Sequence, residues 1–138
     1  MYEKYFNKLR EECLIRNRFS QTADTYINNI SHFMKWTGYK SMEDLSLQDA
    51  RSFILEKRNS GLSSATCNFY NSSICFLYKH VLHIPWDQDI VPRMRLDVKL
   101  PKVLSLEEIE KLIDSATEIR NKAIIALLYS SGMRVGEL

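Results

Sequence analysis

Glycine, proline and cysteine are scarce in this chain of 138 residues, which holds four, three and three of them. Glycine and proline interrupt regular structure, and here they fall between periodic segments, so their scarcity favours helices. The three cysteines are odd in number and lack Cys-x-x-Cys spacing. This usage predicts reduced thiols in a cytoplasmic protein and not a disulfide framework.

A zinc site is an alternative role for these thiols, because Cys75, His80 and His83 lie close together in the sequence. Their spacing matches no common structural zinc site. Cys67 and Cys75 also fall on an apolar helical stripe. We therefore expect buried free thiols, with no metal and no cofactor.

Long apolar runs and an apolar leader are both lacking, so no membrane partner is expected. Hydrophobic residues make up 45% and charged residues 26%, which is a globular composition. The net charge of +2 does not by itself indicate nucleic acid. Charge is concentrated locally, where four basic residues face one acid, Asp97: Arg93, Arg95, Lys99 and Lys102. This strip is either a phosphate contact or a solvated linker.

The apolar residues recur with helical spacing throughout, which predicts an all-α fold. Residues 1–84 are expected to form a four-helix bundle with helices over 2–15, 21–36, 47–59 and 63–82. Ser46 and Ser63 are the expected N-caps of the third and fourth helices. Residues 85–103 hold all three prolines and are expected to form a linker.

Residues 104–138 are expected to begin a second domain. Ser105 and Glu108 form a capping-box pattern for a helix that ends near residue 116. A further helix over 120–131 is apolar nearly all round, so much of its surface should be exposed unless additional chain covers it. Gly132 should end this helix, and Arg134 should open the next, where a helix start and a guanidinium together favour a phosphate.

The residues around Arg134 resemble a known family. The pattern Leu-Leu-Tyr-x-Ser-Gly-Met-Arg-x-x-Glu-Leu (127–138) is similar to the first active-site box of the tyrosine recombinases, which include phage integrases. Leu-Pro-Lys-Val-Leu-Ser-x-x-Glu-Ile (100–109) resembles the segment that opens their catalytic domain. Two further sets resemble helices of their N-terminal SAM-like core-binding domain: Thr22, Tyr26, Phe33 and Trp36, then Ser63, Thr66, Asn68 and 76–79.

The resemblance implies DNA breakage and rejoining through a tyrosine nucleophile, without metal. Arg134 matches the first catalytic arginine, which would contact the scissile phosphate, and Glu137 matches the acid that follows it. The family's other catalytic boxes and its nucleophilic tyrosine lie beyond this point, and none of the seven tyrosines here can be assigned that role. We therefore expect the front part of a recombinase that cannot cleave DNA alone.

Binding of double-stranded DNA is the expected remaining activity, without a small-molecule substrate. The candidate contacts are Thr22, Thr66, Asn68, Lys79, Arg93, Arg95 and Lys102. Each has an alternative, because the threonines and the asparagine also suit helix caps and Lys79 a solvated flank. The other functional hypotheses are a helical module that pairs with full-length recombinase subunits, and an inert gene remnant.

Overall fold

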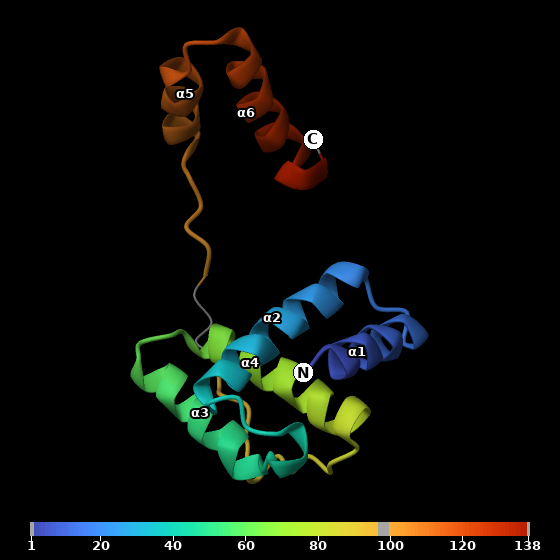
Figure 1. Cartoon of the computed structure of the whole chain (residues 1–138). Helices are drawn as coiled ribbons and strands as arrows, with labels where there is room; N and C mark the ends of the chain where they lie inside the picture. Colours follow the sequence, from blue (N-terminus) through green and yellow to red (C-terminus); the bar gives the residue numbers. More distant parts are fainter. Residues whose placement is uncertain (1, 97–99, 138) are drawn as a thin grey trace. The chain divides into compact units, whose positions relative to one another are not determined.

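Helices account for all the regular structure in residues 2–96 and 100–137, the part of the chain that the computed structural model describes (Figure 1). The α-helices are α1 (Glu3–Ile15), α2 (Ser20–Trp36), α3 (Leu47–Asn59), α4 (Ser64–Phe76), α5 (Leu106–Ser115) and α6 (Ile119–Ser131). Three short elements complete them: the 3₁₀ turns η1 (Met42–Asp44) and η3 (Val135–Glu137), and the π-helix η2 (Leu77–Leu82). The predicted all-α fold is confirmed.

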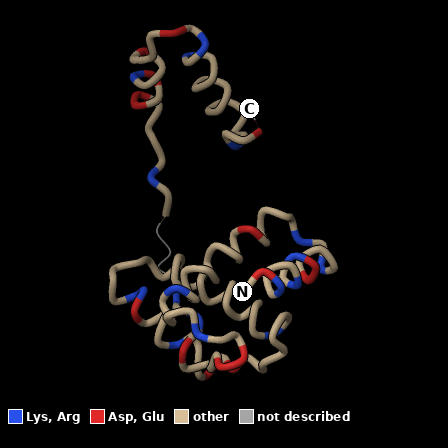
Figure 2. The backbone as a smooth tube through the Cα atoms, viewed as in Figure 1, with Lys and Arg blue, Asp and Glu red and all other residues tan. Residues whose placement is uncertain are grey.

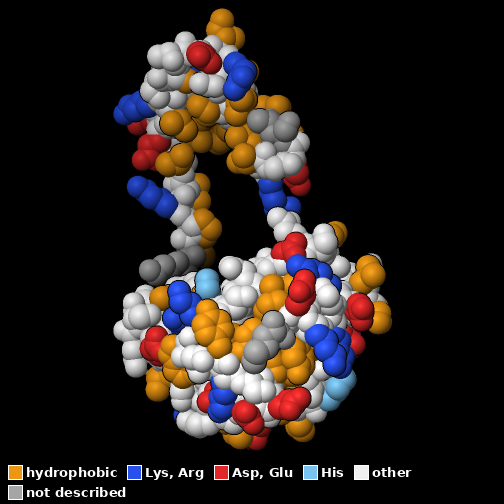
Figure 3. All heavy atoms as spheres, in the orientation of Figure 1, with side chains coloured by type: hydrophobic (Ala, Val, Ile, Leu, Met, Phe, Trp, Pro, Cys, Tyr) orange, Lys and Arg blue, Asp and Glu red, His pale blue; other side chains and the backbone are white. Residues whose placement is uncertain are grey.

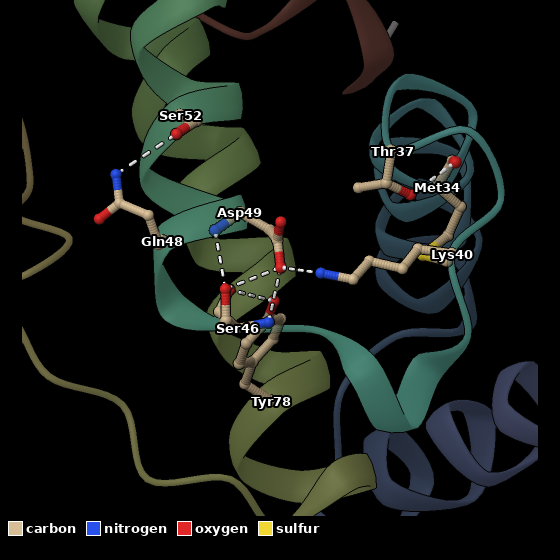
Figure 4. Close-up of polar contacts among 8 residues, drawn as sticks. All are labelled: Met34, Thr37, Lys40, Ser46, Gln48, Asp49, Ser52 and Tyr78. Atoms are coloured by element: carbon tan, nitrogen blue, oxygen red, sulfur yellow. Dashed lines mark hydrogen bonds and ion pairs between the residues drawn. The ribbon is translucent and has the colours of Figure 1, made fainter.

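Serine caps set the starts of α3 and α4, as the sequence predicts. At α3 the Ser46 hydroxyl accepts from the Asp49 N–H at 3.3 Å, and the Asp49 carboxylate accepts from the Ser46 N–H at 2.7 Å (Figure 4). Lys40 Nζ donates to the same carboxylate at 3.0 Å. Partial burial raises the pKa of Asp49, but the hydrogen bonds from Ser46 and Lys40 outweigh this effect, and the net pKa is lowered.

The first compact unit is built around α4. This helix packs against α2 and α3, and its π-helical continuation η2 packs against α1 (Figure 1). Phe33 of α2 and Phe53 of α3 are fully buried and meet edge to face, with ring centroids 5.2 Å apart. Tyr78 of η2 is also fully buried, and its hydroxyl donates to the Ser46 carbonyl at 2.9 Å, which ties η2 to the start of α3 (Figure 4).

Polar residues of α2 and α4 meet within this core. Asn29 Nδ2 donates to Ser73 Oγ at 2.9 Å, and both residues are buried. Tyr26 pairs with Phe76 on one side of that bond, and His32 pairs with Tyr70 on the other. This order shows that α2 and α4 run antiparallel where they touch. The bond satisfies both polar groups, which would otherwise be costly to bury.

The segment 84–96, which falls within the predicted linker from residue 85 onward, packs onto the first unit, and this unit extends past residue 84. Val91 is 2% exposed and belongs to the core. Asn68 Nδ2 donates to the Met94 carbonyl at 2.8 Å, and Asn68 Oδ1 accepts from the Met94 N–H at 2.8 Å. Asn71 Nδ2 donates to the Pro92 carbonyl at 3.1 Å. The two buried amides therefore replace the periodic apolar contacts that the sequence pattern lacks here.

The second compact unit pairs α5 with α6. The expected capping box is present, with the Ser105 N–H donating to Glu108 at 2.8 Å. Gly132 ends α6 in the left-handed conformation, with φ of +66°, as predicted. Hydrophobic side chains gather on the face of this pair that is visible in Figure 3. Among residues 100–137 none is fully buried, so this unit has no closed core of its own.

Over the described ranges, none of the helices combines the length and the apolar character that a bilayer crossing requires.

Candidate nucleic-acid interface

A cavity of about 360 Å³ in the first unit gathers basic side chains from three separate segments. Arg18 comes from the connection between α1 and α2, Lys79 from η2, and Arg93 from the 84–96 segment. His80, Tyr26 and Gln88 also line it. We call Arg18, Lys79 and Arg93 the basic cluster. Figure 2 shows basic and acidic residues mixed over this unit, so the cluster results from side chains that reach one cavity and not from a charge gradient.

The chain between α1 and α2 positions Arg18. Asn17 takes a left-handed backbone with φ of +51°, and the Arg18 N–H returns to the Cys13 carbonyl at 2.9 Å. The Arg18 guanidinium donates to the Tyr26 hydroxyl at 3.3 Å and lies 5.5 Å from the centre of the Phe76 ring. These contacts hold the guanidinium at the cavity without neutralising its charge.

Lys79 of η2 and Arg93 of the 84–96 segment line the same cavity. Across residues 2–96, neither they nor Arg18 form an ion pair. The Cys75 thiol lines the same cavity, and burial raises its pKa while Lys79 and Arg93 act in the opposite direction. The cluster is therefore a site of unpaired positive charge in a concave surface, which suits an anion.

His80 extends the basic surface toward α1. Its Nδ1 lies 3.0 Å from an Arg16 guanidinium nitrogen, and its ring lies 4.7 Å from the ring of Phe76. Burial lowers the pKa of His80, and Arg16 lowers it further. The ring is thus neutral at pH 7 and accepts a hydrogen bond from Arg16.

Comparison with known proteins places this geometry in a family. Residues 5–88 match the phage integrase N-terminal SAM-like domain, and this match covers more than half of the chain. The chain belongs to this family. The matched residues contain all of α1 to α4 except the first two residues of α1, and they include Arg18 and Lys79.

Several curated relatives are similar over most of the chain. The tyrosine recombinase XerC of Bacillus licheniformis is 31% identical over 135 residues, which cover 89% of this chain and 44% of the relative. XerC of Bacillus subtilis is 30% identical, and the match covers 97% of this chain and 49% of the relative. Tyrosine recombinase XerD of Oceanobacillus iheyensis is 26% identical, and the match covers 99% of this chain and 49% of the relative. The chain spans about half the length of the curated relatives that it matches.

In this member of the integrase SAM-like family, Asn68 is the predicted DNA contact with the least exposed side chain. It is 6% exposed, and both its amide nitrogen and its amide oxygen are used by the Met94 backbone. Its role as a DNA contact stays a prediction, and the side chain anchors the 84–96 segment. The sequence pattern alone does not reveal this role, because Met94 lies 26 residues away.

The two threonines lie in first helical turns. Thr66 is exposed, and its N–H and hydroxyl both contact the Ser63 hydroxyl that caps α4, at 3.2 and 2.9 Å. Thr22 is half-buried in the first turn of α2, and its N–H donates to the Phe19 carbonyl at 2.9 Å. Neither lines the basic cavity, so their DNA contacts stay predictions.

The predicted basic residues separate into two groups. Lys79 and Arg93 share the cavity, whereas Arg95 is exposed but does not line it. Lys102 is exposed and belongs to the second unit. Lys99 and Asp97 of the predicted basic strip lie outside the described residues. Sequence reasoning missed Arg18 and His80; the only signal for Arg18 was a basic residue just before a predicted helix.

Arg134 lies on the second unit, directly before η3. Its guanidinium is 88% exposed and lies 3.6 Å from the Glu137 carboxylate, which also accepts from the Arg134 N–H at 2.8 Å. The predicted helix start is a single 3₁₀ turn over Val135–Glu137. Glu137 thus orients the backbone and side chain of Arg134, while the guanidinium stays open to solvent.

The thiols differ in burial. Cys13 and Cys67 are buried and Cys75 is partly buried, and all three are free. Throughout residues 2–96 and 100–137, no group of three or more His, Cys, Asp or Glu side chains is arranged to hold a metal ion.

Proposed function

We propose that this chain binds double-stranded DNA through its first unit, as the N-terminal portion of a site-specific tyrosine recombinase that acts in DNA integration and recombination. The observation that supports this most directly is the convergence of Arg18, Lys79 and Arg93 on one cavity without an acidic partner. Unpaired Lys and Arg side chains neutralise backbone phosphates and release counterions, which drives binding to DNA. The names of the XerC and XerD relatives support the same substrate.

The polar faces of α2 and α4 complete the proposed interface. Thr22 and Thr66 lie in the first turns of these helices, where hydroxyl groups can reach phosphates or base edges. Arg95 and Lys102 are proposed to contact phosphates outside the cavity. With so few basic contacts, we expect weak affinity that falls steeply with salt.

A mobility-shift assay tests this function. The chain should shift duplex DNA at 50 mM salt, and the double variant Lys79→Ala/Arg93→Ala should bind at least about tenfold more weakly and lower the salt slope by about two. Lys4→Ala, which removes one exposed charge from α1 away from the cavity, is the matched control and should bind like wild type. No shift at any salt, or equal binding by the double variant, contradicts the proposal.

We also propose that Arg134 contacts the scissile phosphate in the recombinase and that Glu137 orients it. Bidentate contact from a guanidinium stabilises the charge that builds on a phosphate during attack. Transesterification also needs a nucleophile, and the motifs that carry it in the family have no counterpart in this sequence. The chain alone should therefore form no covalent adduct with nicked duplex DNA in a denaturing gel, and an adduct would contradict this part of the proposal.

A helical module that pairs with recombinase subunits is the second candidate. The exposed apolar side chains of the second unit favour it, because Leu127 is 46% exposed and Tyr129 is 53% exposed. Co-purification with a full-length relative, lost on Leu127→Ser, would support it. DNA binding that depends on Lys79 and Arg93 without such pairing would favour the first candidate. An inert remnant would show neither.

A cytoplasmic location is part of the proposal.

A further inference from the structure

Arg16 and His80 form a contact that faces the basic cluster from the α1 side. Arg16 Nη2 lies 3.0 Å from His80 Nδ1. An arginine side chain can only donate, so Nδ1 must be the acceptor, and the single proton of the neutral ring is on Nε2. The other Arg16 nitrogen, Nη1, donates to the Glu12 carbonyl at 3.1 Å and to the Glu12 carboxylate. Arg16 is thus held on α1 by Glu12 and directed to His80.

We propose that His80 is a protonation-controlled gate for Arg16, which joins the basic cluster as a fourth phosphate contact when His80 is protonated. This inference rests on the proposed DNA-binding function. A proton on Nδ1 removes the acceptor for Arg16 and sets an imidazolium against a guanidinium. Arg16 then loses its tie to η2, and both cations become available to an anion in the cavity that His80 already lines.

The charges around His80 favour this exchange in the presence of phosphate. From α1 it faces Arg16 and Glu12, from the α1–α2 connection Arg18, and from its own element Lys79. Arg93 of the 84–96 segment lines the same cavity. Four cations against one carboxylate oppose protonation of His80 in the free protein. A DNA phosphate in the cavity would offset part of this positive charge, so DNA binding should favour the uptake of a proton at His80.

The aromatic ring of Phe76 makes the rearrangement local. The guanidinium carbons of Arg16 and Arg18 lie 5.9 and 5.5 Å from its centre, and the His80 ring lies 4.7 Å from it. The two guanidinium groups make cation–π contacts with this ring and His80 makes an aromatic contact, and none of these contacts requires the hydrogen bond between Arg16 and His80. The change therefore needs side-chain rotation and not movement of α1.

The other two histidines lack this arrangement. His32 Nδ1 lies 3.0 Å from the hydroxyl of Tyr70, which can donate or accept and therefore tolerates a protonated ring. His83 Nε2 lies 3.1 Å from Lys8 Nζ, but His83 does not line the basic cavity. His32 is thus the matched control for His80.

The test compares DNA affinity at pH 7.5 and 5.5 for wild type, His80→Asn and His32→Asn. Asparagine keeps an acceptor near the position of Nδ1 but cannot be protonated. Wild type and His32→Asn should gain affinity at pH 5.5, and His80→Asn should gain at least about threefold less, because neither the imidazolium nor the released Arg16 is available to a phosphate. Arg16→Gln should lose a smaller part of the gain, because the imidazolium of His80 still forms. Circular dichroism at both pH values confirms that each variant is folded.

The outcomes separate this inference from the function on which it rests. An equal gain in His80→Asn and wild type, with binding at pH 7.5 still sensitive to Lys79→Ala/Arg93→Ala, overturns the gate alone. Absence of DNA binding by wild type at both pH values overturns the gate and the proposed function together. Histidine NMR adds an independent reading: the Arg16 side-chain signals should move with the titration of His80 and not with that of His32.

Discussion

The two units of the chain differ in which residues they bury. The first buries polar side chains, and the second leaves apolar side chains exposed. In the first, α4 carries Asn68, Asn71 and Ser73 into the interior, where each has a hydrogen-bond partner. In the second, the apolar helix α6 has no fully buried residue, and Leu127 remains half exposed. Composition therefore does not decide which residues are buried. The packing around a helix does, and within residues 100–137 the helix that packs against α6 is α5.

The substitution with the largest expected effect on stability tests whether the core of the first unit is independent of the second unit. Phe33→Ala removes a fully buried ring that contacts Phe53 and Trp36, and should lower the free energy of unfolding by about 3–5 kcal/mol. Leu127→Ala in α6 should change it by less than about 0.5 kcal/mol. Both tryptophans, Trp36 and Trp86, lie in the first unit, so their fluorescence during urea unfolding reports this core. Similar losses for the two variants would show that the units unfold together.

The next effect tests whether the 84–96 segment belongs to the first unit. Asn68→Ala leaves the Met94 N–H and carbonyl without partners and should cost about 1–3 kcal/mol. Asn28→Ala, an exposed position on α2, is the control and should cost far less. Limited proteolysis should cut within 84–96 faster in Asn68→Ala. Unchanged stability and unchanged cleavage would show that this segment is a linker and not part of the first unit.

A smaller effect concerns the cap of α3. Asp49→Asn weakens the contacts with Ser46 and Lys40 and should cost about 1 kcal/mol at pH 7. Because the folded pKa of Asp49 is lowered, its stabilisation is present above the unfolded pKa and is lost as the pH falls through the folded value. The difference between wild type and Asp49→Asn in urea unfolding should therefore shrink below about pH 4. A constant difference down to pH 2 would contradict this.

The smallest effect is the equivalent change in the second unit. Ser105→Ala removes the side-chain cap of α5, which carries the same kind of capping box as α3. Without a core to couple it to the rest, the loss should appear as fraying of α5 and leave the tryptophan-monitored transition within about 0.5 kcal/mol of wild type. Hydrogen exchange at the amides of α5 measures the fraying directly.

Local patterns predicted most of this fold. Three helix starts are predicted by Ser46, Ser63 and Ser105, and one helix end is predicted by Gly132. Each of these residues acts on backbone groups a few residues away. The prolines of the 84–96 segment pointed to a linker. Its attachment depends on Asn68 and Asn71, which are distant in sequence and look like ordinary helix residues.

The candidate site was less predictable for the same reason. Lys79 and Arg93 were named as separate contacts, and only the folded chain shows that they share a cavity. Arg18 and His80 carry no local signature, since an arginine in a connection and a histidine near a helix end are common. Their role depends on Phe76 and Arg16, which the fold brings to them.

The wide turn of η2 has a consequence for the register of the chain. Over Leu77–Leu82 each turn holds more residues than an α-helix would, and the element closes at His83 with φ of +57°. Deleting one residue here would let the standard helical period resume and would rotate every later side chain of the element by roughly a quarter turn. Lys79 and His80 would then point along new directions, and the buried Val81 of the same element would leave its place in the core. A single-codon deletion in this stretch is thus a way to displace the cavity's charges without altering their number.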